Sequence, residues 1–178
     1  MEWNAVMAVA EILGVMLLVV SLIYVSIQLK QNNQLARAES ERDLLRDWNQ
    51  EISKLVQDAS TTQIFQKALV DFDALSNVEK CMFMVRMANL MNVYISCLRM
   101  AEKGMIHDKE VTLFGDVCFS MIITPGGRQW WSVAGLLFTI KAEIDQRIER
   151  EGDSAMTFID IVPFWAPDHD PDQAASQS

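Results

Sequence analysis

Side chains that could carry chemistry are few in this 178-residue chain, and they are scattered. One of the two histidines, His107, stands in a loop between two predicted helices, where a solvated imidazole is the expected state. The other stands in the run PDHDPD, whose side chains could hold a divalent cation weakly. The candidate ligands in that run are Asp168, His169, Asp170 and Asp172. A metal site needs ligands in a fixed geometry. Because this run lies in a tail that we expect to be mobile, we expect no metal to bind there.

Patterns typical of nucleophiles and cofactor sites are missing from the sequence. It contains no G-x-S-x-G, H-E-x-x-H, P-loop or dinucleotide fingerprint. Cys81, Cys97 and Cys118 each lie in an apolar helical pattern, which predicts buried, reduced thiols and no zinc site or disulfide framework. Asp71 and Asp73 stand in a predicted helical stretch and point to different sides, which suits solvent better than acid–base catalysis. We predict no catalytic residue, no cofactor and no metal.

One ionisable residue, Glu11, interrupts the long apolar run of residues 5–29. Near the outer end of a membrane span its carboxylate could reach the headgroup water. Alternatively it faces a protein interior, as ionisable groups inside membranes usually do. The second interpretation fits a stripe of polar and small residues that recurs every three or four positions. This stripe consists of Glu11, Gly14, Leu18, Ser21, Val25 and Gln28. Because a single span has no partner in its own chain, the stripe predicts an oligomer interface or a pore lining.

The stretch PGGRQWW is the most unusual motif outside the apolar run. Arg128 beside Trp130 and Trp131 could bind an anion or a partner. Gly126 and Gly127, however, allow backbone conformations that other residues avoid, so the alternative is a tight turn between helices followed by two packing tryptophans.

The apolar run is long enough to cross a bilayer, which takes about 20 residues as a helix. No basic residue precedes it and no small-residue cleavage site follows it, so we expect a retained anchor and not a signal peptide. The basic residues next to it all follow it: Lys30, Arg37, Arg42 and Arg46. The positive-inside rule then places the C-terminal side in the cytoplasm.

The elements that position these residues are predicted to be helices. Residues 30–58 are predicted to be helical, and two alternatives remain open: the helix continues the span as one long rod, or it bends at KQNNQ. Ser76 and Glu79 form a capping box that starts a helix ending near residue 103, with Gly104 as its C′ residue. The other predicted helices cover residues 62–74, residues 109–123 capped by Asp108, and residues 128–150 beyond a break at TPGG.

The apolar helix that follows Ser76 could be mistaken for a second span. Its uncharged stretch between Arg86 and Arg99 is too short for one and contains Asn89 and Asn92, so we interpret it as the central core helix. After the last helix, prolines exclude a regular helix. The segment IDIVPFW is expected to dock on the domain or on the membrane surface, and the end beyond it to be disordered.

These observations predict an all-α protein. One N-terminal transmembrane helix, residues 5–29, follows a short extracytoplasmic segment, residues 1–4. A cytoplasmic bundle of four to five helices, residues 30–152, precedes an irregular acidic tail, residues 153–178. The net charge of −9 and the lack of a basic stripe argue against nucleic acid as a partner.

Three segments carry a resemblance to a known family: EILGVMLLVVSLIYVSIQLKQNNQLARA, DFDALSNVEK and PGGRQWW. The chain resembles an uncharacterised family of small bacterial single-span membrane proteins with a helical cytoplasmic domain. The resemblance covers much of the chain and implies its architecture and a place in the bacterial inner (plasma) membrane. Its motifs are structural, so it implies no activity.

The leading functional hypothesis is a membrane-anchored, self-associating interaction or scaffold protein. Its expected partners are membrane lipid and further copies of the chain or another membrane protein. The alternative is a homo-oligomeric channel whose pore is lined by Glu11, Ser21 and Gln28, because rings of carboxylates select cations. A membrane-bound enzyme is a third hypothesis, which lacks a visible catalytic set.

Overall fold

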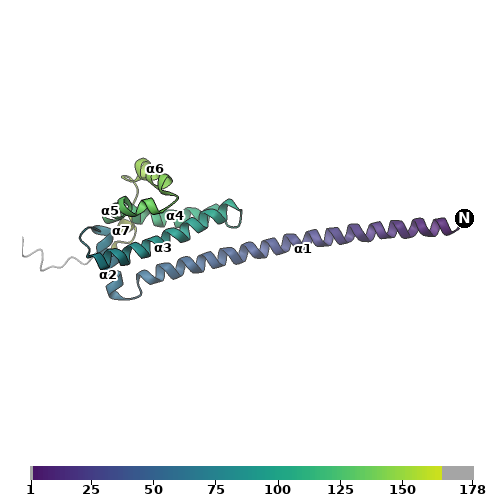
Figure 1. Cartoon of the computed structure of the whole chain (residues 1–178), viewed down its shortest axis with the longest axis horizontal. Coiled ribbons are helices and arrows are strands. Elements are labelled where there is room, and N and C mark those ends of the chain that lie inside the picture. The colour runs from purple at the N-terminus through teal and green to yellow at the C-terminus, as the bar shows by residue number, and fades with distance from the viewer. Residues whose placement is uncertain (1, 166–178) are drawn as a thin grey trace, which may run out of the picture. The chain divides into compact units, whose positions relative to one another are not determined.

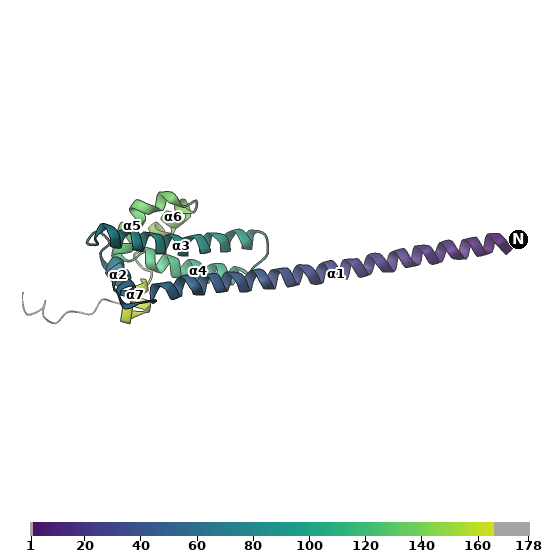
Figure 2. The same ribbon diagram turned by 60° about the horizontal axis from the view of Figure 1, so that its bottom comes forward.

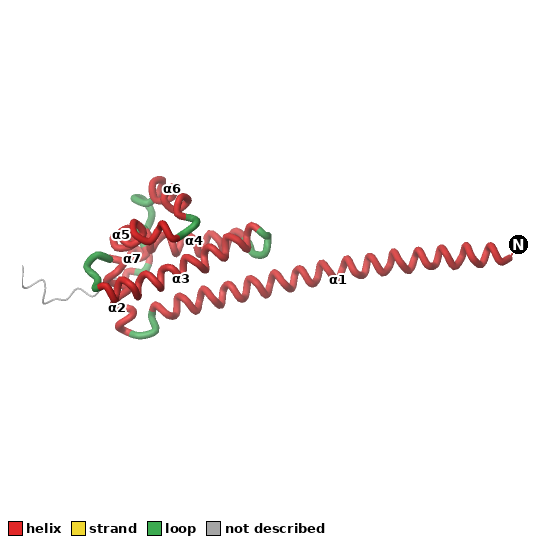
Figure 3. The backbone as a smooth tube through the Cα atoms, viewed as in Figure 1, coloured by secondary structure: helices red, strands yellow, loops and turns green. Residues whose placement is uncertain are grey.

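The computed structural model describes residues 2–165, and within this range every regular element is helical (Figure 3), as predicted. The chain divides into two units, Met1–Arg42 and Asp43–Ser178, called below the N-terminal unit and the helical domain. The elements, labelled in Figure 1, are α1 (Glu2–Leu55), α2 (Ala59–Val70), α3 (Asn77–Glu102), α4 (Asp108–Ile122), α5 (Pro125–Ala134), the 3-10 turn η1 (Gly135–Leu137), α6 (Lys141–Glu151), α7 (Phe158–Ile161) and the 3-10 turn η2 (Pro163–Trp165).

The N-terminal unit consists of α1 residues. Helical structure runs through KQNNQ, residues 30–34, without a break, so the bend considered above does not occur. By length and composition α1 is a candidate membrane span, and none of the residues in its most apolar window is buried. Helix α3 passes the same test, but a third (33%) of its window is buried.

The core of the helical domain lies between the last turns of α1 and helices α2 to α6. Leu44, Trp48 and Leu55 of α1 belong to it, and the Trp48 ring stacks on Phe114 of α4 at 4.4 Å between centroids. Helices α3 and α4 lie side by side in both Figure 1 and Figure 2. Helix α3 contributes a buried face, as expected for a core helix: Phe83, Met87, Leu90, Met91, Ile95 and Cys97.

Local signals at the ends of α3 are confirmed. The Ser76 hydroxyl accepts a hydrogen bond from the Glu79 backbone N–H at 3.4 Å, and the Glu79 carboxylate accepts one from the Ser76 N–H at 2.8 Å. Together they satisfy two backbone donors that a helix start leaves unpaired. Beyond the other end, Gly104 has φ 64°, the left-handed conformation expected at C′.

Two predicted helix ends are wrong by a few residues. Helix α2 stops at Val70, because the Asp71 carboxylate accepts hydrogen bonds from the N–H groups of Asp73 and Ala74 and forms a turn. The residue that caps α4 is His107 and not Asp108, which is already helical.

The predicted helix over residues 128–150 is also wrong, because the structure divides this stretch into α5, η1 and α6. The run TPGG does not break the chain into a loop. Thr124 caps α5, accepting a hydrogen bond from the Gly127 N–H at 3.0 Å, and Pro125 takes the first helical position, where its missing N–H costs nothing. The turn after α5 then brings Phe138 and Ile140 into the core.

The segment after α6 docks on the helical domain, one of the two outcomes expected for IDIVPFW. A capping box of Thr157 and Asp160 starts α7. The Trp165 ring packs edge-on against Phe65 of α2, with centroids 5.7 Å apart, and against Phe158 at 5.5 Å. An aromatic anchor therefore joins the end of the described chain to the core.

Candidate functional site

Helix α1 carries all six residues of the predicted stripe, and each is exposed in the chain. A Cβ added at Gly14 would meet no atom within 4 Å, so the helix surface there is open to a close neighbour. The Ser21 hydroxyl donates to the Leu17 carbonyl at 2.8 Å, which satisfies its proton inside the helix. The Glu11 carboxylate is the one charged group in residues 5–29. The stripe thus offers small and polar positions on a surface that is mostly apolar.

The tryptophans of PGGRQWW are not an open surface. Trp130 is 0% exposed and Trp131 4% exposed. The Trp131 indole N–H donates to the Asp145 carboxylate at 2.8 Å, and Trp130 packs edge-on against Phe83. The prediction that Trp130 and Trp131 form a partner surface with Arg128 is therefore wrong for the two tryptophans. Both indoles are core residues, as the alternative interpretation of two packing tryptophans expects.

Arg128 and the two glycines have structural tasks. The Arg128 guanidinium donates to the Gly152 carbonyl at 2.8 Å and pairs with Asp153 at 3.0 Å, which ties α5 to the end of α6. A Cβ on Gly126 would overlap the backbone of Ala68, and one on Gly127 would overlap the Met121 carbonyl. The glycines thus permit close packing of α5, and not a tight turn. The Thr-Pro pair before them is the signal that could have indicated a helix start.

Two of the three cysteines are kept unreactive by burial. Cys97 and Cys118 are buried as predicted, whereas Cys81 is exposed, which corrects that prediction. Burial raises the pKa of the Cys97 thiol to about 11 and that of Cys118 to about 12. Both thiols therefore stay protonated near neutral pH, and a thiol is a poor nucleophile compared with a thiolate.

The other candidates for chemistry do not come together. His107 lies at the start of α4 and makes no capping hydrogen bond with its side chain. Asp71 is engaged in its turn, and Asp73 pairs with Lys80 at 3.6 Å. Within residues 2–165 no three His, Cys, Asp or Glu side chains gather in a geometry that could hold a metal ion. The run that contains Asp168, His169, Asp170 and Asp172 lies outside the described residues.

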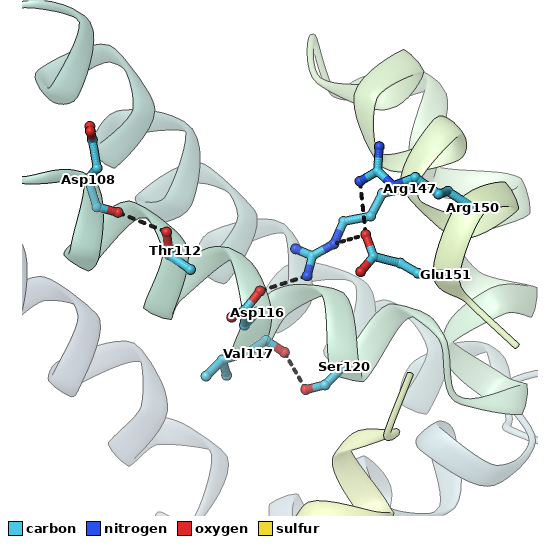
Figure 4. Close-up of polar contacts among 8 residues, drawn as sticks. All are labelled: Asp108, Thr112, Asp116, Val117, Ser120, Arg147, Arg150 and Glu151. Atoms are coloured by element: carbon cyan, nitrogen blue, oxygen red, sulfur yellow. Dashed lines mark hydrogen bonds and ion pairs between the residues drawn. The ribbon is translucent and has the colours of Figure 1, made fainter. Parts of the chain in front are cut away.

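A cluster of charged side chains joins α6 to α4 (Figure 4). The Arg147 guanidinium donates to Asp116 at 2.7 Å and to Glu151 at 3.1 Å, and it lies 4.1 Å from the centroid of the Phe119 ring. A hydrogen bond from Arg150, with Arg147 nearby, lowers the pKa of Glu151. Charges, hydrogen bonds and a cation–π contact satisfy these groups within the protein, so the cluster acts as a clamp between two helices.

Comparisons with models of protein families, with curated proteins and with solved structures found no match. The likeness to the bacterial family of single-span membrane proteins therefore stays a resemblance.

Proposed function

We propose that this protein is a membrane-anchored, self-associating helical scaffold whose N-terminal unit spans the bacterial inner membrane once. The observation that carries the proposal is the uncovered apolar surface of α1, where no residue of the most apolar window is buried. Leaving apolar surface in water costs about 25 cal/mol per Å², so a helix that is apolar over most of its circumference requires an apolar environment. Lipid supplies that environment without any further protein.

The basic residues that follow the span support an orientation with the helical domain in the cytoplasm. In this orientation a domain without a visible catalytic set is held at the membrane face. Its role is then to bind other proteins or to hold further copies of itself in place.

The stripe supports self-association in the membrane. Lipid offers helices no hydrophobic drive to associate, so they associate through close packing and hydrogen bonds at small and polar residues. Gly14 supplies the open surface, and Glu11 supplies a polar group that gains from leaving lipid.

Alkaline extraction of membranes tests the anchor. The full chain should remain in the membrane pellet, and a variant that lacks residues 2–29 should move to the supernatant. Recovery of the intact chain in buffer without detergent would contradict the proposal.

Disulfide crosslinking tests the interface, in a Cys81→Ser background that removes the exposed native thiol. Leu18→Cys lies on the stripe, and Met16→Cys lies at nearly the same depth on the opposite face of the helix. We expect crosslinked dimers in membranes for Leu18→Cys and none for Met16→Cys. Equal crosslinking at both positions, or none at either, would remove the stripe as the interface.

One observation favours a channel as a second candidate. The only charged side chain of residues 5–29, Glu11, belongs to the stripe, so in an oligomer several carboxylates would surround the same axis. Chain reconstituted in planar bilayers would then carry cation currents that Glu11→Gln reduces. A scaffold carries no current with either residue.

A further inference from the structure

The part of α1 that follows the apolar run, residues 30–42, is uncovered over most of its length. We call it the connecting segment. Helix α1 continues through it without a break, yet every residue from Lys30 to Glu39 is exposed. Its sequence, KQNNQLARAESER, contains two adjacent asparagines, which are weak helix formers. Most of the stability of a helix in a protein comes from packing of one face, so a partner outside the single chain best explains a helix here.

The stripe of α1 continues into the connecting segment. Its positions alternate by three and four residues, and the same alternation after Gln28 reaches Asn32, Leu35, Glu39 and Arg42. This is the a/d spacing of a coiled coil, with Asn32 at an a position and Leu35 at a d position. Leu35 is 61% exposed and is the one large apolar side chain in the sequence of the segment. A second helix that packs along the stripe would cover it.

The remaining residues of the connecting segment are sorted around this line. At about 100° of rotation per residue, Ala36 and Ala38 lie on either side of the stripe, at the e and g positions. Lys30 and Arg37 lie on the opposite side of the helix. Small residues beside Leu35 let two helices approach closely, while the two cations remain in water. The segment therefore has one face suited to a second helix.

A second copy of the chain fits this face. In two parallel copies equal positions meet, so Leu35 packs on Leu35 and Asn32 lies opposite Asn32. The asparagine amide both donates and accepts, so two of them can form a hydrogen bond with each other. Glu39 and Arg42 occupy successive layers, which brings each carboxylate about one turn from the arginine of the other copy. The face is thus complementary to itself.

The helical domain leaves the same line of α1 open. The alternation continues at Arg46, Asn49 and Ser53, and all three residues are exposed. The residues of α1 that enter the core, such as Leu44 and Trp48, fall between these positions. Burial in the domain therefore does not compete with a second copy for the stripe positions.

We propose that α1 pairs with α1 of a second copy as a parallel dimer, and that the contact continues beyond the apolar run through residues 32–42. Val25 and Asn32 at a positions favour two strands. Two helices in contact along one stripe enclose no pore, so such a dimer supports the scaffold and not the channel. This inference rests on the proposed self-association along the stripe.

Disulfide crosslinking of the full chain in membranes tests the contact, again in the Cys81→Ser background. Leu35→Cys lies on the stripe, and Gln34→Cys is the matched control, since it is exposed at the same height but on another face of the helix. Leu18→Cys reports the stripe within the apolar run. We expect crosslinked dimers for Leu35→Cys and Leu18→Cys, and none for Gln34→Cys.

The other outcomes separate the two proposals. Crosslinking at 18 without crosslinking at 35 overturns the contact in the connecting segment and leaves the stripe in the membrane intact. Equal crosslinking at 34 and 35 overturns the assigned face. No crosslinking at 18 contradicts self-association along the stripe and, with it, this inference.

Native mass spectrometry in mild detergent tests the copy number. The original chain should appear as a dimer. Asn32→Val replaces the polar pair by an apolar one and should add larger oligomers, whereas Asn33→Val, on another face, should leave the dimer unchanged. Trimers or larger assemblies of the original chain would overturn the dimer, and equal spectra for the two variants would overturn the role of Asn32. Monomers alone would contradict the self-association itself.

Discussion

Helices α1 and α3 are the two described helices long and apolar enough to span a membrane, yet their surroundings differ completely. In α1 no residue of the apolar window is buried, and in α3 a third of the window is buried in the domain core. Composition alone therefore does not separate a span from a core helix. The distribution of apolar residues around the helix distinguishes the two cases. A helix with a polar face can place that face in water and its apolar face in a protein core.

The polar residues of α3 show this directly. The Asn89 amide donates to the Glu51 carboxylate of α1 at 3.3 Å, while Leu90, its neighbour in sequence, is 1% exposed. Residues 12–29 of α1 contain no charged side chain, so no face of that stretch prefers water. Substitutions made in parallel in the two helices would sharpen or break this contrast.

The largest expected effect is that of Leu90→Asp, which places an unpaired carboxylate in the core. We expect a loss of about 3–5 kcal/mol, a large part of the 5–15 kcal/mol that stabilises a typical domain. Thermal melting followed by circular dichroism measures it. Val85→Asp on an exposed face of α3 is the control and should change little. An unchanged melt for Leu90→Asp would show that α3 is not the core helix.

The corresponding change in α1 is Val20→Asp. The domain melt should not change, because nothing in the chain covers Val20, but insertion into a bilayer should become less favourable by about 2.5–3.5 kcal/mol. Membrane extraction compares this variant with Val20→Ala, which should stay in the pellet. If Val20→Asp also stays fully in the pellet, lipid does not surround this part of α1.

Glycine substitutions extend the comparison. Gly126→Ala forces a Cβ into the backbone of Ala68, so we expect a loss of about 1–3 kcal/mol in the domain melt. Gly14→Ala in α1 meets no atom within 4 Å and should leave the melt unchanged. Equal melts for the two variants would mean that α5 does not pack closely on α2.

The smallest expected effect is on the stability of the domain at low pH. Hydrogen bonds with Ser76 lower the pKa of Glu79 below 4.5 in the folded domain. The ionised Glu79 side chain therefore makes its full contribution to stability above the pKa that it has in the unfolded chain. This contribution is lost as the pH falls through the pKa of Glu79 in the folded domain. Glu79→Gln should lose less stability than the original chain between about pH 6 and about pH 3. Identical losses for both chains would show that the capping carboxylate does not contribute.

Features set by near neighbours were predictable from the sequence. The capping box at Ser76, the left-handed Gly104 and the helical class each depend on a few adjacent residues. Helical spacing over residues 128–150 predicts an inward face of Trp131, Ala134, Phe138, Ile144 and Ile148. The first four of these are buried and Ile148 is partly buried, despite the wrong helix boundaries. Helical spacing identified these residues even where the helix itself is interrupted.

Of the site candidates, the exposed stripe on α1 follows from helical spacing alone. The burial of Trp130 and the exposure of Cys81 do not, because each depends on which distant helix lies opposite. The Arg147 clamp was not predictable for the same reason, since its partner Asp116 is 31 positions away.

By itself, the amino-acid sequence determined that the chain is helical and that one long stretch of it is predominantly apolar, because backbone caps and side-chain hydropathy act over a few residues. Only the tertiary structure decided which apolar side chains are covered. It turned a predicted long helix into α5, η1 and α6, buried two tryptophans and left Leu136 and Leu137 exposed. Those outcomes arise from packing between residues far apart in the chain, because the core has room for only some of the apolar side chains.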